Sequence, residues 1–376
     1  MNARLATGAA ATALLALACA LAHAAATTPA TTPATVADPT YSMADFERVD
    51  KIDAHVHLHG TAARFMALAG RDGMRVLTIN VDYPDFPPLA RQRAEALALV
   101  HANPGRAAFA AAFSATDLLT ADWPGRTLAD LDAALAAGAV GVKLWKNVGM
   151  ALKDADGRYV LADDPRLDAF YDHLERAGSV LLVHQAEPLN CWLPMEQMTV
   201  RSDREYFSEH PQYYMYRHPE MPSHEALLAA RDRAIEKHPH LAVDAVHLAS
   251  LEWDVDRVAA FLDAHPAAHV DMAARLVHLE FQAAKDPAKV RAFLLRYQDR
   301  VLYGSDDAYG PADDDDKALA EVDHGWREDF RFLATADPMT TNEFAPPFHG
   351  LALPRAVVDK LYSGNARRLF PKGWSH

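Results

Sequence analysis

Short apolar runs alternate with longer amphipathic stretches along most of this chain, and this alternation restricts its fold more than any other feature. Eight runs are predicted to be strands: 51–58, 75–81, 107–113, 139–145, 180–184, 241–247, 269–272 and 300–304. Helical patterns between them cover 89–101, 128–137, 167–177, 225–238, 255–264 and 287–297. Strands separated by helices form parallel sheets, because each helix carries the chain back to the start of the next strand.

Eight such units predict an α/β fold, a (β/α)8 TIM barrel. A doubly wound open sheet is the alternative, but it normally has a glycine-rich phosphate loop after an early strand, and the sequence has none. We expect one domain over residues 41–376. A long insertion after strand five, Glu187–Pro222, is rich in aromatic residues and Met. It predicts a lid, a subunit contact or a small core of its own.

The first 40 residues differ in composition from the rest. A positive charge in "MNAR" is followed by the apolar stretch Leu5–Leu21 and by the small residues "AHA" at Ala22–Ala24. We interpret residues 1–24 as a signal peptide, and 25–40, with the repeat "ATTPATTPAT", as a Pro/Thr/Ala-rich tether. Export predicts a periplasmic or secreted protein, and Cys19 leaves a lipid anchor as an alternative.

The charge balance narrows the class of partner. The chain has 37 Lys and Arg against 51 Asp and Glu, a net charge of -14. This excess repels nucleic acid and anionic lipid, so a small molecule is the expected partner. Of the two cysteines, Cys19 and Cys191, the mature domain keeps at most one, which excludes an internal disulfide. The long insertion is also compatible with a homodimer.

Polar residues at the ends of the predicted strands define a candidate site. His55 and His57 close the first strand, His184 ends the fifth, His247 ends the sixth and Asp306 follows the eighth. Because the carboxyl ends of barrel strands meet at one mouth, these side chains are expected to converge. Three imidazoles and one carboxylate suit Zn²⁺ or a similar divalent ion. The predicted ligands are His55, His57, His184 and Asp306.

Further candidates lie near the same mouth. Lys143 is near the end of strand four in "GVKLW". Asp271 and Arg275 follow strand seven, where an Arg could clamp a substrate carboxylate, or the two could form a structural pair. Glu187, three residues after His184, could contact the substrate or hold its loop.

The motifs "IDAHVH", "VLLVHQAEP", "AVHLAS", "VLYGSDD" and "YSGNARRLF" together resemble the amidohydrolase superfamily of metal-dependent barrels. They are most similar to its amidohydrolase-related branch, which includes aminocarboxymuconate-semialdehyde decarboxylase and several sugar lactonases. The resemblance spans Lys51 to Phe370. It implies that the strand-one histidines, His184 and Asp306 bind one metal, and that His247 acts on water or substrate.

The resemblance also implies two alternatives for the number of metal ions. Binuclear members carry a carboxylated Lys on strand four that bridges two ions. Lys143 would be that residue, and His184 and His247 would then hold the second ion. Mononuclear relatives share the sequence "GVKL", and we favour one ion, most simply Zn²⁺, with Lys143 in a supporting role.

These inferences predict an exported metal-dependent hydrolase that cleaves an amide, ester or lactone bond of a small molecule with metal-activated water. Asp306 would take the proton of that water, and His247 would orient the water or donate to the developing oxyanion. A non-oxidative decarboxylase on the same ligands is the first alternative. A catalytically inactive periplasmic binding protein is the alternative of another class.

Overall fold

The computed structural model describes residues 39–313 and 316–374. The predicted signal peptide, Cys19 and all but the last two residues of the predicted tether lie outside the described residues. Within the described ranges, the helices are too short or too polar to cross a membrane.

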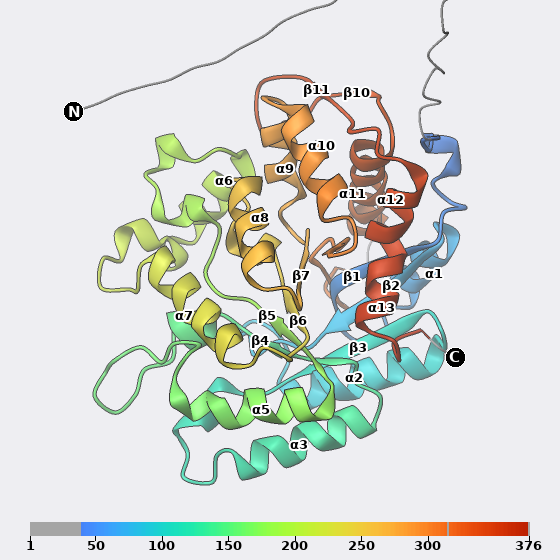
Figure 1. Cartoon of the computed structure of the whole chain (residues 1–376). Coiled ribbons are helices and arrows are strands. Elements are labelled where there is room, and N and C mark those ends of the chain that lie inside the picture. The colour runs from blue at the N-terminus through green and yellow to red at the C-terminus, as the bar shows by residue number, and fades with distance from the viewer. Residues whose placement is uncertain (1–38, 314–315, 375–376) are drawn as a thin grey trace, which may run out of the picture. The chain divides into compact units, whose positions relative to one another are not determined.

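Nine parallel strands form one sheet with the order β8-β7-β6-β5-β4-β3-β2-β1-β9 (Figure 1). They are β1 (Lys51–Leu58), β2 (Met74–Ile79), β3 (Ala107–Ala112), β4 (Gly141–Leu144), β5 (Val180–Val183), β6 (Val243–Ala245), β7 (Ala268–Asp271), β8 (Val301–Leu302) and β9 (Asp307–Tyr309). Consecutive strands are neighbours, as a chain that winds around a barrel requires. The predicted TIM-barrel fold is therefore confirmed.

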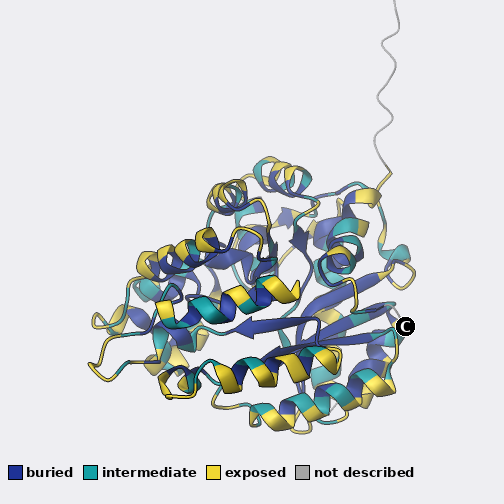
Figure 2. Cartoon of the chain, turned by 60° about the horizontal axis from the view of Figure 1, so that its bottom comes forward, coloured by how far each residue is buried: buried dark blue, intermediate teal, exposed yellow. Residues whose placement is uncertain are grey.

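Helices connect the strands and cover the outside of the sheet. They are α1 (Ala63–Arg71), α2 (Leu89–Ala102), α3 (Gly125–Ala136), α4 (Asn147–Met150), α5 (Asp168–Ala177), α6 (Arg201–Glu209), α7 (His224–Lys237), α8 (Val255–Ala264), α9 (Leu276–Ala283), α10 (Pro287–Arg296), α11 (Asp316–Ala334), α12 (Arg355–Asp359) and α13 (Asn365–Leu369). Figure 2 shows that the strands are buried while the helices expose one face. This is the burial expected of amphipathic helices packed on a sheet.

The last strand position of the barrel is divided between β8 and β9. β8 pairs with β7, and β9 pairs with β1. Between these pairings the amide of Ala54 donates to the carbonyl of Tyr303 at 3.0 Å, and the amide of Asp306 donates to the carbonyl of His55 at 2.8 Å. Residues 301–309 thus bridge β7 and β1 and close the ring. At Gly304 a Cβ atom would lie 2.9 Å from the Cβ of His55, so the close approach requires glycine.

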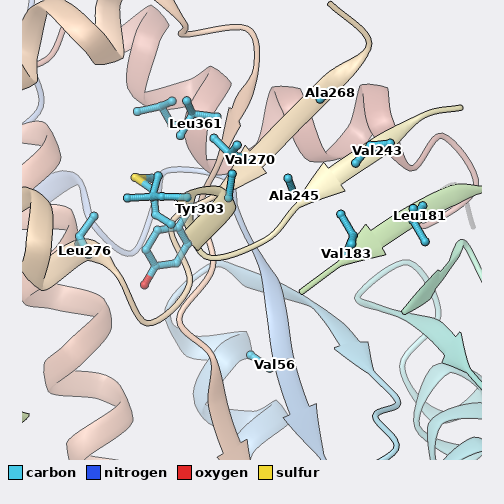
Figure 3. Packing of buried hydrophobic residues seen from close by; sticks show 14 of the residues in the cluster. Val56, Leu181, Val183, Val243, Ala245, Ala268, Val270, Leu276, Tyr303 and Leu361 are labelled. Atoms are coloured by element: carbon cyan, nitrogen blue, oxygen red, sulfur yellow. The ribbon is translucent and has the colours of Figure 1, made fainter. Parts of the chain in front are cut away.

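Two apolar clusters stabilise the barrel. The larger one lies between strands and helices, and Figure 3 shows its alternate residues from β5, β6 and β7, among them Val183, Val243 and Val270. The smaller one is formed by the strand residues that face the interior of the barrel, such as Leu77 and Leu182. They pack against the C-terminal segment 366–374. The inward-facing side chains of the strands therefore form a packed interior, closed by the end of the chain.

The predicted insertion after β5 forms short helical turns and α6. Its buried residues Cys191, Met198, Phe207, Tyr214 and Met215 make a separate apolar cluster. The small core that was one of the three alternatives for this segment is therefore confirmed, and the lid and the subunit contact stay predictions. At the start of α6, the amide of Arg201 donates to the carbonyl of Glu343 at 3.0 Å, which ties the insertion to the C-terminal part of the chain.

Candidate active site

A β-bulge in β1 determines the direction of the two strand-one histidines. Asp53 pairs with Val76, and Val56 pairs with Thr78, so β1 has one residue more than β2 between these pairs. The amide of His55 donates instead to the carboxylate of Asp53, at 3.2 Å. Such an extra residue reverses the alternation of side chains along a strand.

The burial of the neighbouring residues confirms this reversal. Ile52 and Ala54, before the bulge, belong to the interior cluster, whereas Val56, after it, packs with the outer cluster. Without the bulge, His55 and His57 would share the outward face with Val49 and Lys51. With it, both imidazoles face the mouth of the barrel.

Hydrogen bonds at Nδ1 fix the orientation of both imidazoles. His55 Nδ1 lies 2.6 Å from the Asp271 carboxylate, and His57 Nδ1 lies 2.8 Å from the carbonyl oxygen of Ile79. Because both partners are acceptors, Nδ1 carries the proton and Nε2 presents a lone pair. The Nε2 atoms lie 3.3 Å (His55) and 3.2 Å (His57) from Oδ1 of Asp306. These three residues therefore form a group with metal-ligand spacing.

His247 lies beside this group, and His184 lies beside His247. The ring of His247 is centred 4.8 Å from that of His55 and 4.2 Å from that of His184. His247 Nδ1 is 2.9 Å from the carbonyl oxygen of Ala273, so its Nε2 is also the basic nitrogen. His184 Nε2 is buried and has no hydrogen-bond partner among the described residues. A buried nitrogen of this kind is free to bind a metal ion or a water molecule.

The backbone is strained at Asp306 and in the turn that begins at His247. Asp306 has φ 73°, and the four residues from His247 to Ser250 have φ between 51° and 61°. Residues with a Cβ rarely adopt this left-handed region, and such strain gathers at functional sites. The buried guanidinium of Arg231 donates to the carbonyl of Ala249, and the Ser250 hydroxyl donates to the carbonyl of Ala186 at 3.3 Å. These contacts hold the strained turn in place.

The protonation states of the site suit a metal. Burial holds the pKa of His184 and His247 well below the ordinary value, so both imidazoles are neutral at pH 7. Burial acts to raise the pKa of Asp306. The interactions with His247, His55 and His57 outweigh this effect, and the pKa lies well below the ordinary value. Neutral imidazoles and an ionised carboxylate are the forms that bind metal ions.

Lys143 lies at the end of β4, inside the site. Its side chain is buried, and Nζ is 3.3 Å from Nε2 of His55. Burial lowers the pKa of Lys143 to about 8, although the negative charges of Asp271 and Asp306 act to raise it. The structure thus brings Lys143 to the predicted ligands.

The three predicted substrate residues lie in different surroundings. Besides His55, Asp271 accepts the amide of His247 at 2.6 Å and that of Ala273 at 3.2 Å, so this buried carboxylate supports the histidines. Arg275 donates Nη1 to the carbonyl of its neighbour Ala274 at 3.0 Å, while its buried Nε has no described partner. A hydrogen bond between Asp271 and Arg275 is not found in the described structure.

Glu187 lies in the wall of a cavity at the start of the insertion. The carboxylate of Glu187 forms an ion pair with Lys146, which follows β4. The cavity has a volume of about 490 Å³, and its apolar wall includes Tyr83, Trp145, Met150 and Tyr213. A series of ring contacts leads from His57 through Phe86 and Tyr83 to Trp145, with centroid distances of 5.3, 5.1 and 5.2 Å. The predicted site therefore adjoins a space of ligand size.

Sequence reasoning missed Asp244, in the middle of β6. It is fully buried, and neither carboxylate oxygen has a hydrogen-bond partner in the described part of the chain. Burial and, after it, the nearby Asp271 raise its pKa well above the ordinary value. The available signal was a charged residue inside the apolar run "LAVDAVH", three residues before His247.

The sequence matches the family model described as Amidohydrolase over residues 52–372. The chain therefore belongs to the amidohydrolase family, and the predicted class, a metal-dependent enzyme of the amidohydrolase superfamily, is confirmed. No curated protein sequence matches the chain.

Solved structures with the same fold include enzymes of more than one reaction type. The chain is similar to 2,6-dihydroxybenzoate decarboxylase from Rhizobium, with 14% identity, a TM-score of 0.53, and coverage of 86% of this chain and 99% of that one. It is also similar to a protein from Pseudomonas putida provisionally named 2-pyrone-4,6-dicarboxylic acid hydrolase, with 13% identity, a TM-score of 0.50, and coverage of 86% and 98%. At these identities the likeness shows the fold alone.

Proposed function

We propose that this chain is an exported metal-dependent hydrolase that cleaves an amide, ester or lactone bond of a small molecule. The observation that carries the proposal is the convergence of the Nε2 atoms of His55 and His57 on one oxygen of Asp306. The residues that would hold a divalent ion, most simply Zn²⁺, are His55, His57, His184 and Asp306. Such an ion, when bound, polarises a carbonyl and makes water a stronger acid.

Asp306 is suited to move the proton of the attacking water. Its side chain is 29% exposed, while that of His55 is fully buried, so Asp306 is reached from the mouth of the barrel. Both imidazole contacts use Oδ1. This leaves Oδ2 to accept the proton from the water and to return it to the leaving group.

His247 is suited to orient the water. Its Nδ1 proton is engaged by the carbonyl of Ala273, and burial keeps the ring neutral. The free Nε2 is then a hydrogen-bond acceptor for water, not a donor to an oxyanion. Of the two roles predicted from the sequence, the geometry supports the first.

One observation favours a non-oxidative decarboxylase as the second candidate. The buried Nε of Arg275 is unpartnered, and the positive charge of Arg275 contributes to the low pKa of His184 and His247. A guanidinium this close to the histidines is suited to a substrate that carries a carboxylate. In that reaction the carbon–carbon bond to the carboxylate breaks, CO₂ leaves, and the carbon takes up a proton.

The experiment that tests the proposal combines metal analysis with two assays. We expect about one divalent ion per chain by plasma mass spectrometry, and chelator-sensitive turnover of a panel of lactones, esters and amides. Two ions per chain would instead make Lys143 a bridging residue and His247 a ligand. CO₂ release from carboxylic acids, without hydrolysis of any member of the panel, would show that the chain is a decarboxylase and not a hydrolase. Absence of both metal uptake and turnover would leave the binding-protein alternative.

Export has its own test. The full-length chain, expressed in a Gram-negative host, is expected in the periplasmic or secreted fraction with residues 1–24 removed. Retention of Met1 on cytoplasmic protein would contradict this part of the proposal. Mass spectrometry of a membrane-bound form would identify acylation at Cys19, and light scattering would measure the predicted homodimer.

A further inference from the structure

A second cavity lies between α9, α11 and the segment that joins two short strands, β10 (Pro338–Met339) and β11 (Phe348–His349). In the chain α9 follows β7 and α11 follows β8, and Figure 1 shows both helices and the two short strands in the upper part of the view. The cavity volume is about 520 Å³, within the range of small-molecule sites. None of the candidate metal ligands lines it.

Carboxyl groups dominate the wall of this cavity. Its carboxylates are Glu280, Glu328, Asp329 and Glu343, and its cation is Arg331. The guanidinium of Arg331 donates to Glu328 at 2.7 Å, so this pair is neutral as a whole. Three carboxylates remain without a cationic partner in the wall.

Two of these three have a neutral hydrogen-bond donor. The hydroxyl of Tyr303 donates to Asp329 at 2.7 Å, and the backbone amide of Ser202 donates to Glu343 at 2.8 Å. Such donors satisfy oxygen lone pairs, but they do not neutralise the charge. The cavity therefore keeps an excess of negative charge when these groups are ionised.

Glu280 is the group for which the protein supplies no partner. Its side chain comes from α9 into the cavity wall, and the residue is only 9% exposed. Its carboxylate has no hydrogen bond or ion pair with any described residue. Burial raises its pKa to about 8, and the charges of Asp329, Glu328 and Glu343 add to this effect. A buried carboxylate without a partner is costly, and a bound cation would offset that cost.

The spacing of the carboxylates distinguishes between kinds of cation. The described groups of three metal-type donors within 4.8 Å of one another include none of the four. A single metal ion would therefore lack the oxygen ligands that Ca²⁺ or Mg²⁺ requires. A longer cation with separate ammonium groups can reach carboxylates that lie apart. Val277, Met339 and Phe348 offer apolar contact for the methylene groups between them.

We propose that this cavity binds an organic polycation of the polyamine class, with one ammonium group on Glu280 and others on Asp329 and Glu343. The site is independent of the proposed function. The cavity also borders the point where the insertion is attached to the C-terminal part of the chain. There Glu343 accepts hydrogen bonds from the backbone amides of Arg201 and Ser202 at the start of α6.

The test is calorimetric titration of the purified chain with spermidine at constant ionic strength. We expect saturable binding of one spermidine per chain. Glu280→Gln keeps the size of the side chain and should weaken spermidine binding at least tenfold. Glu280→Asp keeps the carboxylate, so it should bind spermidine more tightly than Glu280→Gln and less tightly than the parent chain. The matched control is Glu321→Gln, an exposed position on α11 outside the cavity, which should bind as the parent chain does.

Other outcomes would overturn the proposal. Equal affinity of the parent chain and Glu280→Gln would mean that spermidine binds elsewhere on this acidic chain. Binding of CaCl₂ or MgCl₂ that depends on Glu280, without binding of spermidine, would make the cavity an inorganic ion site. Thermal unfolding of each variant shows that it is folded, and Glu280→Gln should melt at or above the parent temperature because it removes an unpaired buried carboxylate.

Discussion

The candidate active site and the second cavity both contain buried carboxyl groups, but these groups differ in their partners and in the direction of their pKa shifts. In the active site, Asp306 and Asp271 contact imidazoles, and their pKa values lie below the ordinary value although burial acts to raise them. In the second cavity, Glu280 has no partner, and burial raises its pKa to about 8. The pKa shifts of these carboxyl groups therefore have opposite directions. Contact with imidazoles, which Glu280 lacks, accounts for the difference between these carboxylates.

The comparison also indicates what each region needs. The active site already holds charged oxygen and neutral nitrogen within reach of one another, which is the arrangement a divalent ion requires. In the second cavity the carboxylates come from α9, α11 and the segment between β10 and β11, and no three of them lie within metal-ligand spacing among the described residues. The first region is therefore expected to respond mainly to changes of metal binding and catalysis, and the second to changes of cation concentration and pH.

Asp306→Asn should have the largest effect. The amide keeps the shape of the side chain but removes both the charge and the proton acceptor, so activity should fall on the order of 10³-fold or more. Metal content per chain and kcat/KM are the measurements. A variant that keeps both its metal and its activity would contradict the assignment of Asp306.

His247→Ala should reduce turnover while the ion is retained. A water-orienting base contributes about 10²–10⁴-fold to the rate, and the remaining ligands do not contact this side chain through a hydrogen bond. Stopped assays give kcat, and plasma mass spectrometry gives the ion content. Loss of metal together with activity would instead indicate that His247 is a ligand of a second ion beside Lys143.

Asp271→Asn tests whether the support behind His55 matters. Loss of the carboxylate that holds Nδ1 of His55 should weaken metal affinity about 10–100-fold, because such supporting bonds orient ligands. Competition with a fluorescent chelator measures the affinity, and Asp263→Asn, on the outer surface of α8, is the control. An unchanged affinity would show that the barrel orients His55 without Asp271.

Glu280→Gln should change the pH dependence of stability, by an amount on the order of 4 kcal/mol. A carboxyl whose folded pKa is raised from 4.5 to about 8 stabilises the fold below pH 4.5 and loses this contribution as the pH rises toward 8. The variant should therefore lose less stability than the parent between pH 5 and pH 8 in urea unfolding. Parallel curves for the two chains would contradict the unpaired state of Glu280 and remove the contrast with Asp306.

Much of the fold follows from local patterns. The predicted strand 51–58 and helix 255–264 agree residue for residue with β1 and α8, because period and end signals within each segment are clear. The prediction missed α1, α6 and α9. These helices have eight or nine residues each, and packing against neighbours contributes more to such short helices than their own sequence does. Strand eight was predicted as one run, 300–304, but β8 covers only 301–302, and the pairing with β1 is made by β9 at 307–309, outside the predicted run.

For the site, the sequence by itself determined which polar residues end which strands, since a strand end is a local property and barrel strands end at one mouth. Only the tertiary structure decided which way they point and what supports them. The bulge after Asp53 turns His55 inward, and Asp271, 216 residues away in the chain, holds its Nδ1. The second cavity likewise joins Glu280 to Asp329 and Glu343 from separate elements. Contacts between residues this far apart depend on how the elements pack, and no local pattern in the chain encodes them.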